Sequence, residues 1–134
     1  MRKRIRIIEA AVVFESILNC ASASEAEIIK CEYTGPFVTT VYSTNTSTLT
    51  ITDAGDVSKN RSLANISLQI IKPNLFELWN VNQEVIQRME LNGRGADGMS
   101  DTVYPYDATL YGYVANFNIR GGCTSNHLPA TPLR

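Results

Sequence analysis

Short runs of alternating apolar and polar residues divide this chain, and this two-residue period constrains its fold more than any other feature. In Thr48–Thr52 the alternation is strict, so that Leu49 and Ile51 face one side and the three threonines face the other. Turn-forming residues separate such runs at intervals of about 8–12 residues. No internal stretch has the period of an amphipathic helix of three turns. The pattern therefore predicts an all-β protein.

Eight segments of the chain fit this pattern and are separated by turn signals. The predicted strands cover residues 28–33, 37–43, 48–52, 66–71, 75–81, 84–91, 108–114 and 117–120. The second and third segments are expected to form a hairpin, as are the fifth and sixth. Seven or eight short strands without helices predict a small antiparallel barrel or sandwich.

The first 23 residues differ in character from the rest. They combine a basic start, a mostly apolar middle and a small-residue exit, which are the parts of a secretory signal. Glu9 and Glu15 interrupt the apolar part, and a charge there opposes insertion into lipid, so a surface helix of a cytosolic protein is the alternative. The length of 134 residues fits one domain. The expected organisation is a signal-like leader at 1–23, a single β domain at 24–125 and an extended C-terminal tail at 126–134.

The leader also bears on localisation. Cleavage after Ala23 would make the mature protein periplasmic or secreted. Cys20 lies in Leu18-Asn19-Cys20-Ala21, which is similar to a lipid-attachment box, so a lipid anchor at Cys20 is the second expectation. The longest uncharged apolar run, Ala10–Phe14, is far too short for a transmembrane span.

The charge of the domain argues against one class of partner. Of 12 basic residues four lie in the leader, and of 13 acidic residues two lie there, which leaves 8 against 11 and a net charge of −3. Nucleic-acid-binding domains carry a basic patch or stripe that binds the phosphates. A weakly acidic domain is therefore not expected to bind nucleic acid.

Three cysteines are present, and removal of the leader with Cys20 leaves the pair Cys31 and Cys123. An even pair at opposite ends of an exported domain favours a disulfide bond. Two unrelated buried thiols are the alternative. The spacing contains no Cys-x-x-Cys and no histidine cluster, so no metal site and no cofactor is expected.

The stretch Gly93–Tyr106 is richer in glycine than a hairpin requires. Asp97 and Asp101 lie four residues apart with Ser100 between them, and this arrangement has three interpretations. The carboxylates could hold a calcium ion, could take part in catalysis, or could accept hydrogen bonds from amides of their own loop. Catalysis by Ser100 would lack a base, because the only histidine is His127 in the expected tail. The candidate binding residues are Asp97, Gly98, Met99, Ser100, Asp101, Tyr104 and Tyr106.

One group of motifs resembles a known family. The run Asp97-Gly98-Met99-Ser100-Asp101, followed by Tyr104-Pro105 and then by Gly121-Gly122-Cys123, resembles the signature of a family of small bacterial envelope proteins and lipoproteins whose function is unsettled. The family pattern is roughly Cys-x-Asp-Gly-Met-Ser-Asp-x-x-Tyr-Pro. Its cysteine falls at Gly95 here, so the resemblance implies that Cys123 pairs with Cys31. In size and design the chain is also similar, more loosely, to periplasmic lysozyme inhibitors.

These observations predict a non-enzymatic binding or inhibitory module of the bacterial envelope that uses the Gly93–Tyr106 loop. Its partner would be an envelope protein or a cell-wall component. A small-molecule carrier with a ligand in the barrel interior is one alternative, and an envelope hydrolase is another. An apolar cavity would favour the carrier, and a pocket that places both aspartates beside a base with a perturbed pKa would favour the enzyme. A filled core with a rigid, exposed loop would favour the protein binder.

Overall fold

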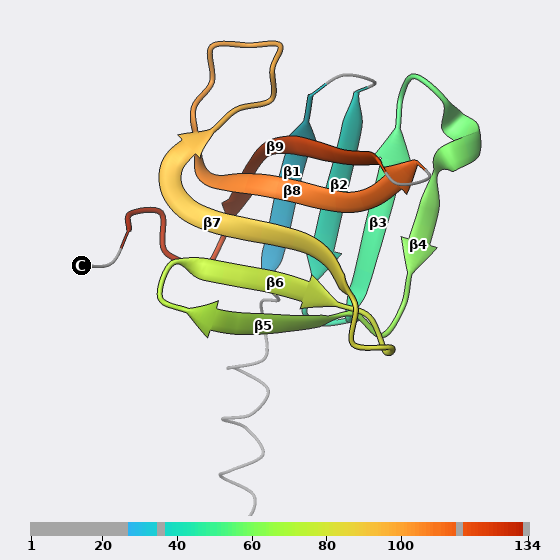
Figure 1. Ribbon diagram of the computed structural model, residues 1–134, viewed down its shortest axis with the longest axis horizontal. Helices are drawn as coiled ribbons and strands as arrows, with labels where there is room; N and C mark the ends of the chain where they lie inside the picture. Colours follow the sequence, from blue (N-terminus) through green and yellow to red (C-terminus); the bar gives the residue numbers. More distant parts are fainter. Residues whose placement is uncertain (1–26, 35–36, 115–116, 133–134) are drawn as a thin grey trace, which may run out of the picture.

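A computed structural model describes residues 27–34, 37–114 and 117–132, which form an almost entirely β-stranded domain (Figure 1). The predicted leader, with Glu9, Glu15 and Cys20, lies outside these residues. Within them, no helix has the length and hydropathy needed to cross a lipid bilayer.

The domain consists of nine strands and one short 3-10 helix, which confirms the predicted all-β class. In chain order the elements are β1 (Ile28–Tyr33), β2 (Val38–Ser43), β3 (Thr48–Asp53), η1 (Val57–Lys59), β4 (Arg61–Leu63), β5 (Ser67–Lys72), β6 (Leu75–Trp79), β7 (Val85–Gly95), β8 (Tyr104–Val114) and β9 (Phe117–Ser125). The predicted count of seven or eight strands is one or two too low. The additional strand is β4, whose three residues are too few to show an alternation.

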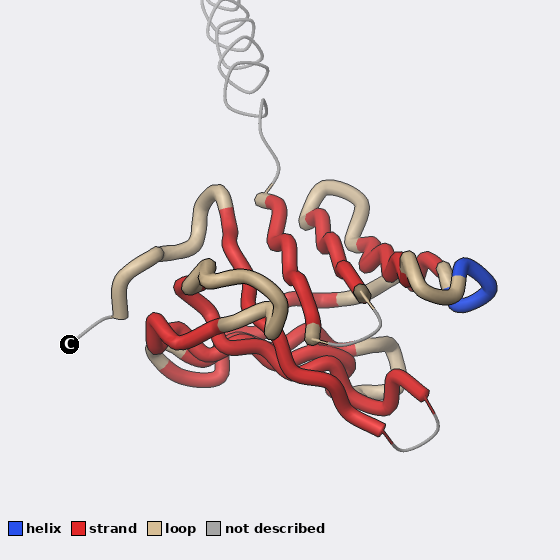
Figure 2. Tube along the Cα trace, turned by 90° about the horizontal axis from the view of Figure 1, so that it is seen from above, coloured by secondary structure: helices blue, strands red, loops and turns tan. Residues whose placement is uncertain are grey.

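All nine strands belong to a single antiparallel sheet with the order β4-β3-β2-β1-β9-β8-β7-β6-β5. The sheet curls into a half-barrel, so that β1–β4 lie behind β5–β9 and run across them (Figures 1 and 2). The first and last strands are neighbours at the centre of the sheet, whereas β4 and β5 are its two edges. The architecture is therefore a curled sheet with two open edges rather than a closed barrel.

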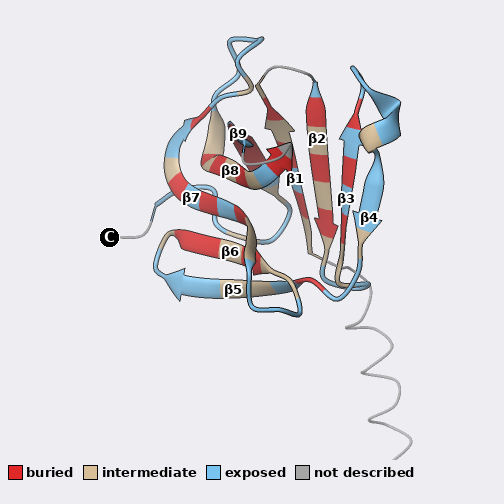
Figure 3. Ribbon diagram, turned by 45° about the vertical axis from the view of Figure 1, so that its right-hand side comes forward, coloured by how far each residue is buried: buried red, intermediate tan, exposed pale blue. Residues whose placement is uncertain are grey.

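The core fills the space between the two parts of the curled sheet. Buried positions alternate with partly buried ones along β2 and with mostly exposed ones along β3 (Figure 3). Leu49 and Ile51 are buried, as predicted. The largest fully buried side chains include Tyr33, Tyr42 and Tyr106. Such rings bury a large apolar area but require partners for their hydroxyl groups. The Tyr42 hydroxyl, for example, donates to the Ile66 carbonyl at 2.8 Å.

The predicted disulfide bond between Cys31 and Cys123 is confirmed. The two residues lie opposite each other on β1 and β9, and neither is accessible to solvent. The disulfide therefore fastens the first strand to the last in the middle of the sheet.

Two strands extend further than predicted. The predicted loop 92–106 shrinks to residues 96–103, because β7 continues through a register shift to Gly95 and β8 begins at Tyr104. The predicted strand 117–120 continues to Ser125, across Gly121 and Gly122. Glycine weakens a strand, but here a side chain at Gly121 would collide with the β1 backbone at Glu32. The two glycines therefore permit a close approach of strands rather than ending one.

The segment after β9 contacts the domain. The Tyr106 hydroxyl donates to the Pro129 carbonyl at 2.7 Å, and Leu128 packs against the core. The first residues of the predicted tail thus lie against the half-barrel.

Candidate functional site

The loop between β7 and β8, residues 96–103, is organised around the Asp97 carboxylate. One oxygen, Oδ1, accepts hydrogen bonds from the amides of Met99 and Ser100 at 2.9 and 2.8 Å. The other, Oδ2, accepts from the Ser100 hydroxyl at 2.8 Å and from the Tyr104 hydroxyl at 3.0 Å. A carboxylate offers about four acceptor positions, so Asp97 has none left for a cation or a substrate.

These hydrogen bonds determine the acid–base properties of the loop. The amides of Ser100 and Met99 stabilise the ionised form, and they hold the pKa of the Asp97 carboxyl well below its usual range. Burial, together with the hydrogen bond to Asp97, raises the pKa of Tyr104 to about 12. A carboxylate with so low a pKa is a weak base. The Asp97 carboxylate is therefore poorly suited to accept the Ser100 proton, although the two side chains are hydrogen-bonded.

Two glycines allow this loop to pack closely against the rest of the sheet. Gly98 has a φ of 76°, and a side chain at this position would collide with Thr34, the residue after β1. Gly122 of β9 lies beneath the Tyr104 ring, where a side chain would collide with the ring. The loop is therefore positioned by β1 and β9 as well as by its own hydrogen bonds.

The predicted site residues divide into three groups. Asp97, Gly98 and Tyr104 build the loop, as described above. Met99, Ser100 and Asp101 are exposed, and Asp101 makes no hydrogen bond or ion pair to any described residue. Tyr106 does not belong to the surface at all: it is only 1 % exposed and packs edge-to-face against Phe76 in the core.

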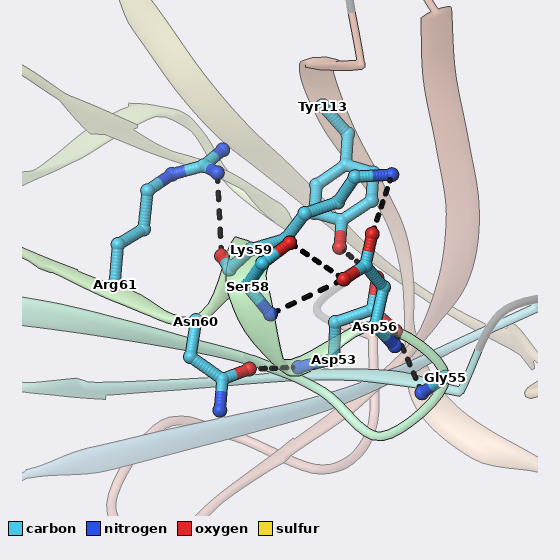
Figure 4. A network of polar contacts seen from close by, with 8 residues as sticks. All are labelled: Asp53, Gly55, Asp56, Ser58, Lys59, Asn60, Arg61 and Tyr113. Atoms are coloured by element: carbon cyan, nitrogen blue, oxygen red, sulfur yellow. Dashed lines mark hydrogen bonds and ion pairs between the residues drawn. The ribbon is translucent and has the colours of Figure 1, made fainter.

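A second loop, which was not among the predicted sites, is organised in the same way. Asp53, buried at the end of β3, accepts from the amides of Gly55 and Asp56 at 2.9 and 3.0 Å, and its other oxygen accepts from the Tyr113 hydroxyl of β8 (Figure 4). Its own amide donates to Asn60 at 2.7 Å. Burial and the bond to Asp53 raise the pKa of Tyr113 to about 12. Each loop thus depends on one aspartate that binds two amides and one tyrosine.

Positive charges complete the second loop. The Arg61 guanidinium and the Lys59 ammonium lie 5.6 and 6.0 Å from the centre of the Tyr113 ring, a distance at which a cation interacts with an aromatic face. Lys59 also pairs with Asp56 at 3.6 Å. The connection between β3 and β4 is therefore fixed to the end of β8.

The β7–β8 loop lies at the start of β8 and the β3–β4 connection lies at the other end of β8, and both are on the upper side of the half-barrel in Figure 1, which we call the loop end. Large apolar side chains are exposed on and beside these two loops. Phe37 precedes β2, Val57 lies in η1, Met99 and Val103 lie in the β7–β8 loop, and Phe117 begins β9 beside the end of β8 that carries Tyr113. Their exposed fractions range from 54 % for Phe37 to 71 % for Val57. We call these five residues the apolar rim.

Only Met99 in the apolar rim was among the predicted site residues. Val57 and Phe117 are single apolar residues next to turns, and Phe37 begins a predicted strand, so the sequence alone does not reveal whether these side chains are buried. Their position beside turn residues was the one sequence feature that could have indicated exposure, as with Gly35-Pro36 before Phe37 and Asp56 before Val57.

Among the described residues, no three His, Cys, Asp or Glu side chains converge where they could bind a metal ion. His127 follows β9 and is exposed, and it is not part of either aspartate network. No family model, no curated protein and no solved structure matches the chain.

Proposed function

We propose that this protein is a non-enzymatic binding module of the bacterial envelope that recognises a protein partner through the apolar rim. The observation that carries the proposal is the distribution of exposed apolar residues. Of the eight large apolar side chains that are exposed in the described part of the chain, five belong to the apolar rim. The other three, Ile70, Ile71 and Val81, lie on β5 and on the turn after β6.

The rigidity of the loop end supports recognition of a protein. Exposed apolar side chains that are edged by polar groups are typical of protein interfaces, and here they lie on both sides of the loop end. Binding is weakened when flexible loops must be ordered, and a loop that is already ordered avoids this cost. The Asp97 and Asp53 networks hold Met99, Val103 and Val57 in place before any partner arrives. Asp101, which is exposed beside Met99, would face a basic group of the partner.

The disulfide bond supports the location in the envelope. Disulfide bonds persist in oxidising compartments such as the bacterial periplasm and are rare in the cytosol. The signal-like leader would deliver the chain to that compartment. The carrier hypothesis has less support, because the interior of the half-barrel is occupied by large side chains such as Tyr33, Tyr42 and Met89.

Site-specific crosslinking of the full chain in a bacterial envelope tests the proposal. A photoreactive residue is placed at Met99 or Phe117 in the apolar rim and, as matched controls, at Ile70 or Val81. We expect the same discrete crosslinked protein from both rim positions and none from the control positions. Equal crosslinking at all four positions, or none at the rim, would reject the proposal.

The affinity for the crosslinked protein gives a second, quantitative test. The triple variant M99S/V103S/F117S should bind that protein at least about tenfold more weakly, since loss of a central apolar contact costs over 1 kcal/mol. The control variant I70S/I71S/V81S also removes three exposed apolar side chains and should bind as the wild type does. Both variants change only exposed residues, so both should fold, and circular dichroism checks this.

A further inference from the structure

The outer face of β7, β8 and β9 carries a polar depression of about 220 Å³ that includes none of the predicted site residues. It is lined by Arg88, Glu90, Asp107, Thr109, Tyr111 and Arg120. These side chains point away from the core, because the alternate positions on β7 and β8, among them Gln87, Met89 and Leu110, are buried. The depression is therefore built on regular, mutually hydrogen-bonded strands rather than on loops.

The register of the strands arranges the charges in two rows. In one row Arg88 pairs with Thr109, and Thr109 pairs with Arg120 on the next strand, so two guanidinium groups flank one hydroxyl. In the neighbouring row Glu90 lies directly opposite Asp107. Two carboxylates in this position repel each other. The depression thus has a positive side and a negative side with a net formal charge of zero.

Only part of this charge is neutralised within the protein. The Nη2 atom of Arg120 lies 2.9 Å from both carboxylate oxygens of Asp107 and forms one ion pair. Arg88, Glu90 and Thr109 make no side-chain hydrogen bond or ion pair to any described residue. This contrasts with Asp53 and Asp97, whose carboxylates are fully engaged. One cation and one anion of the depression are therefore open to a ligand.

We propose that this depression binds a small zwitterion, that is, an amino acid or a short peptide with free ends. The ligand carboxylate would contact the Arg88 guanidinium, the Thr109 hydroxyl and the N–H groups of Arg120 that do not bind Asp107. Arg120 has five N–H donors and uses only those on Nη2 for Asp107. The ligand ammonium would contact Glu90 and Asp107 and relieve their repulsion.

The size and charge of the depression restrict the ligand class. Pockets for drug-sized molecules have volumes of about 300–1,000 Å³, so this smaller depression fits a ligand of amino-acid size. The balanced charge disfavours a polyanion or a polycation. The positive and the negative row are two residues apart along each strand, which is about 6.8 Å. Side chains from the two rows can therefore reach a ligand carboxylate and a ligand ammonium that lie a few ångströms apart.

Nuclear magnetic resonance titration of the full chain at low ionic strength tests the proposal with three probes. Glycylglycine carries both charges, N-acetylglycine carries only the carboxylate and glycinamide carries only the ammonium. We expect amide shifts confined to β7–β9 and affinity for glycylglycine about two- to fivefold above either single-charge probe, the size of one exposed ion pair.

Charge-removing variants assign each end of the ligand. R88Q should lower the affinity for glycylglycine and N-acetylglycine and leave glycinamide binding unchanged, and E90Q should do the reverse. R94Q and D101N remove exposed charges outside the depression and should have no effect. Equal affinity for the three probes, or shifts spread over the whole domain, would overturn the proposal. The spectra themselves confirm that each variant is folded.

Discussion

Individual aspartate and tyrosine residues determine the shape of the loop end. Asp97 and Asp53 each bind two amides through one oxygen and a tyrosine hydroxyl through the other. Short polar side chains stabilise turns because they reach amides two or three residues onward. One of the three interpretations of the sequence assigned this role to Asp97 and Asp101 alike, but in the structure only Asp97 has it. Sequence spacing could not distinguish the two aspartates, because the fold brings the Tyr104 hydroxyl within hydrogen-bond distance of Asp97 and not of Asp101.

We predict that Asp97 makes stability depend on acid pH. The fold lowers the pKa of this carboxyl, so its contribution is fully present above the unfolded-state pKa of about 4. The contribution is lost as pH falls below that value toward the folded-state pKa. Urea unfolding at several pH values should show D97N less stable than the wild type at neutral pH, with the difference shrinking in acid. D101N is the control and should match the wild type. A constant difference across this range would contradict the prediction.

We also predict that Gln87 is essential to the core. Its Oε1 accepts from the Tyr33 hydroxyl at 2.7 Å and from the Thr40 hydroxyl at 2.8 Å, and all three residues are buried. Gln87→Leu would leave two buried hydroxyls unsatisfied and should cost about 2–4 kcal/mol. Tyr33→Phe removes one donor to Gln87 but leaves no buried hydroxyl unsatisfied, so it should cost less stability. The midpoints of urea unfolding at unchanged slope measure both, and a smaller loss for Gln87→Leu would refute the assignment.

At the level of elements, the sequence predicted strands wherever the alternation was long and failed where it was short. The hairpin of β2 and β3 was predicted within one residue at each end, since each strand buries every second side chain. β4 was missed, and β9 was cut short at Gly121. Both errors arise because strand pairing and close approach are set by neighbouring strands that the local sequence does not contain. The four residues of the apolar rim other than Met99 were missed because the local sequence does not show whether an apolar residue is buried.

The β7–β8 loop gives an element-scale prediction with an internal control. Gly93 and Gly98 both have positive φ, 71° and 76°, but only Gly98 faces a neighbour, Thr34, whereas Gly93 faces open space. Gly98→Ala should therefore cost more than Gly93→Ala, which carries only the backbone strain of about 1 kcal/mol. Chemical denaturation of the two variants measures the difference. Equal losses would mean that the loop shifts freely away from Thr34.

For the whole molecule, the disulfide bond was the most informative prediction from sequence. It correctly placed the two ends of the domain together, although no local pattern indicated that β1 and β9 are neighbours. The curl of the sheet and its open edges could not be predicted, because they depend on how the strands twist and pack together.

Removal of this bond should destabilise the domain without changing its fold. The bond closes a loop with a sequence separation of 92 residues, for which chain entropy predicts about 4–5 kcal/mol of stabilisation. The double variant C31A/C123A should lose stability on this scale in urea unfolding. Reduced wild type is the matched comparison. A loss below 1 kcal/mol in both would show that the unfolded chain gains little freedom when the bond is absent.

The position of the same bond also decides where mechanical force would travel through the protein. Ile28 and Asn126 are hydrogen-bonded to each other at the ends of β1 and β9, so tension applied to the two ends of the chain peels these strands apart for only three residues before it reaches Cys31 and Cys123. From there the force passes through the disulfide bond, and the strands formed by the residues between Cys31 and Cys123 in the sequence bear none of it. Single-molecule pulling should therefore show no major extension of the oxidised domain. Addition of a reductant should release roughly 300 Å of chain, at about 3.4 Å for each of the 92 residues of separation.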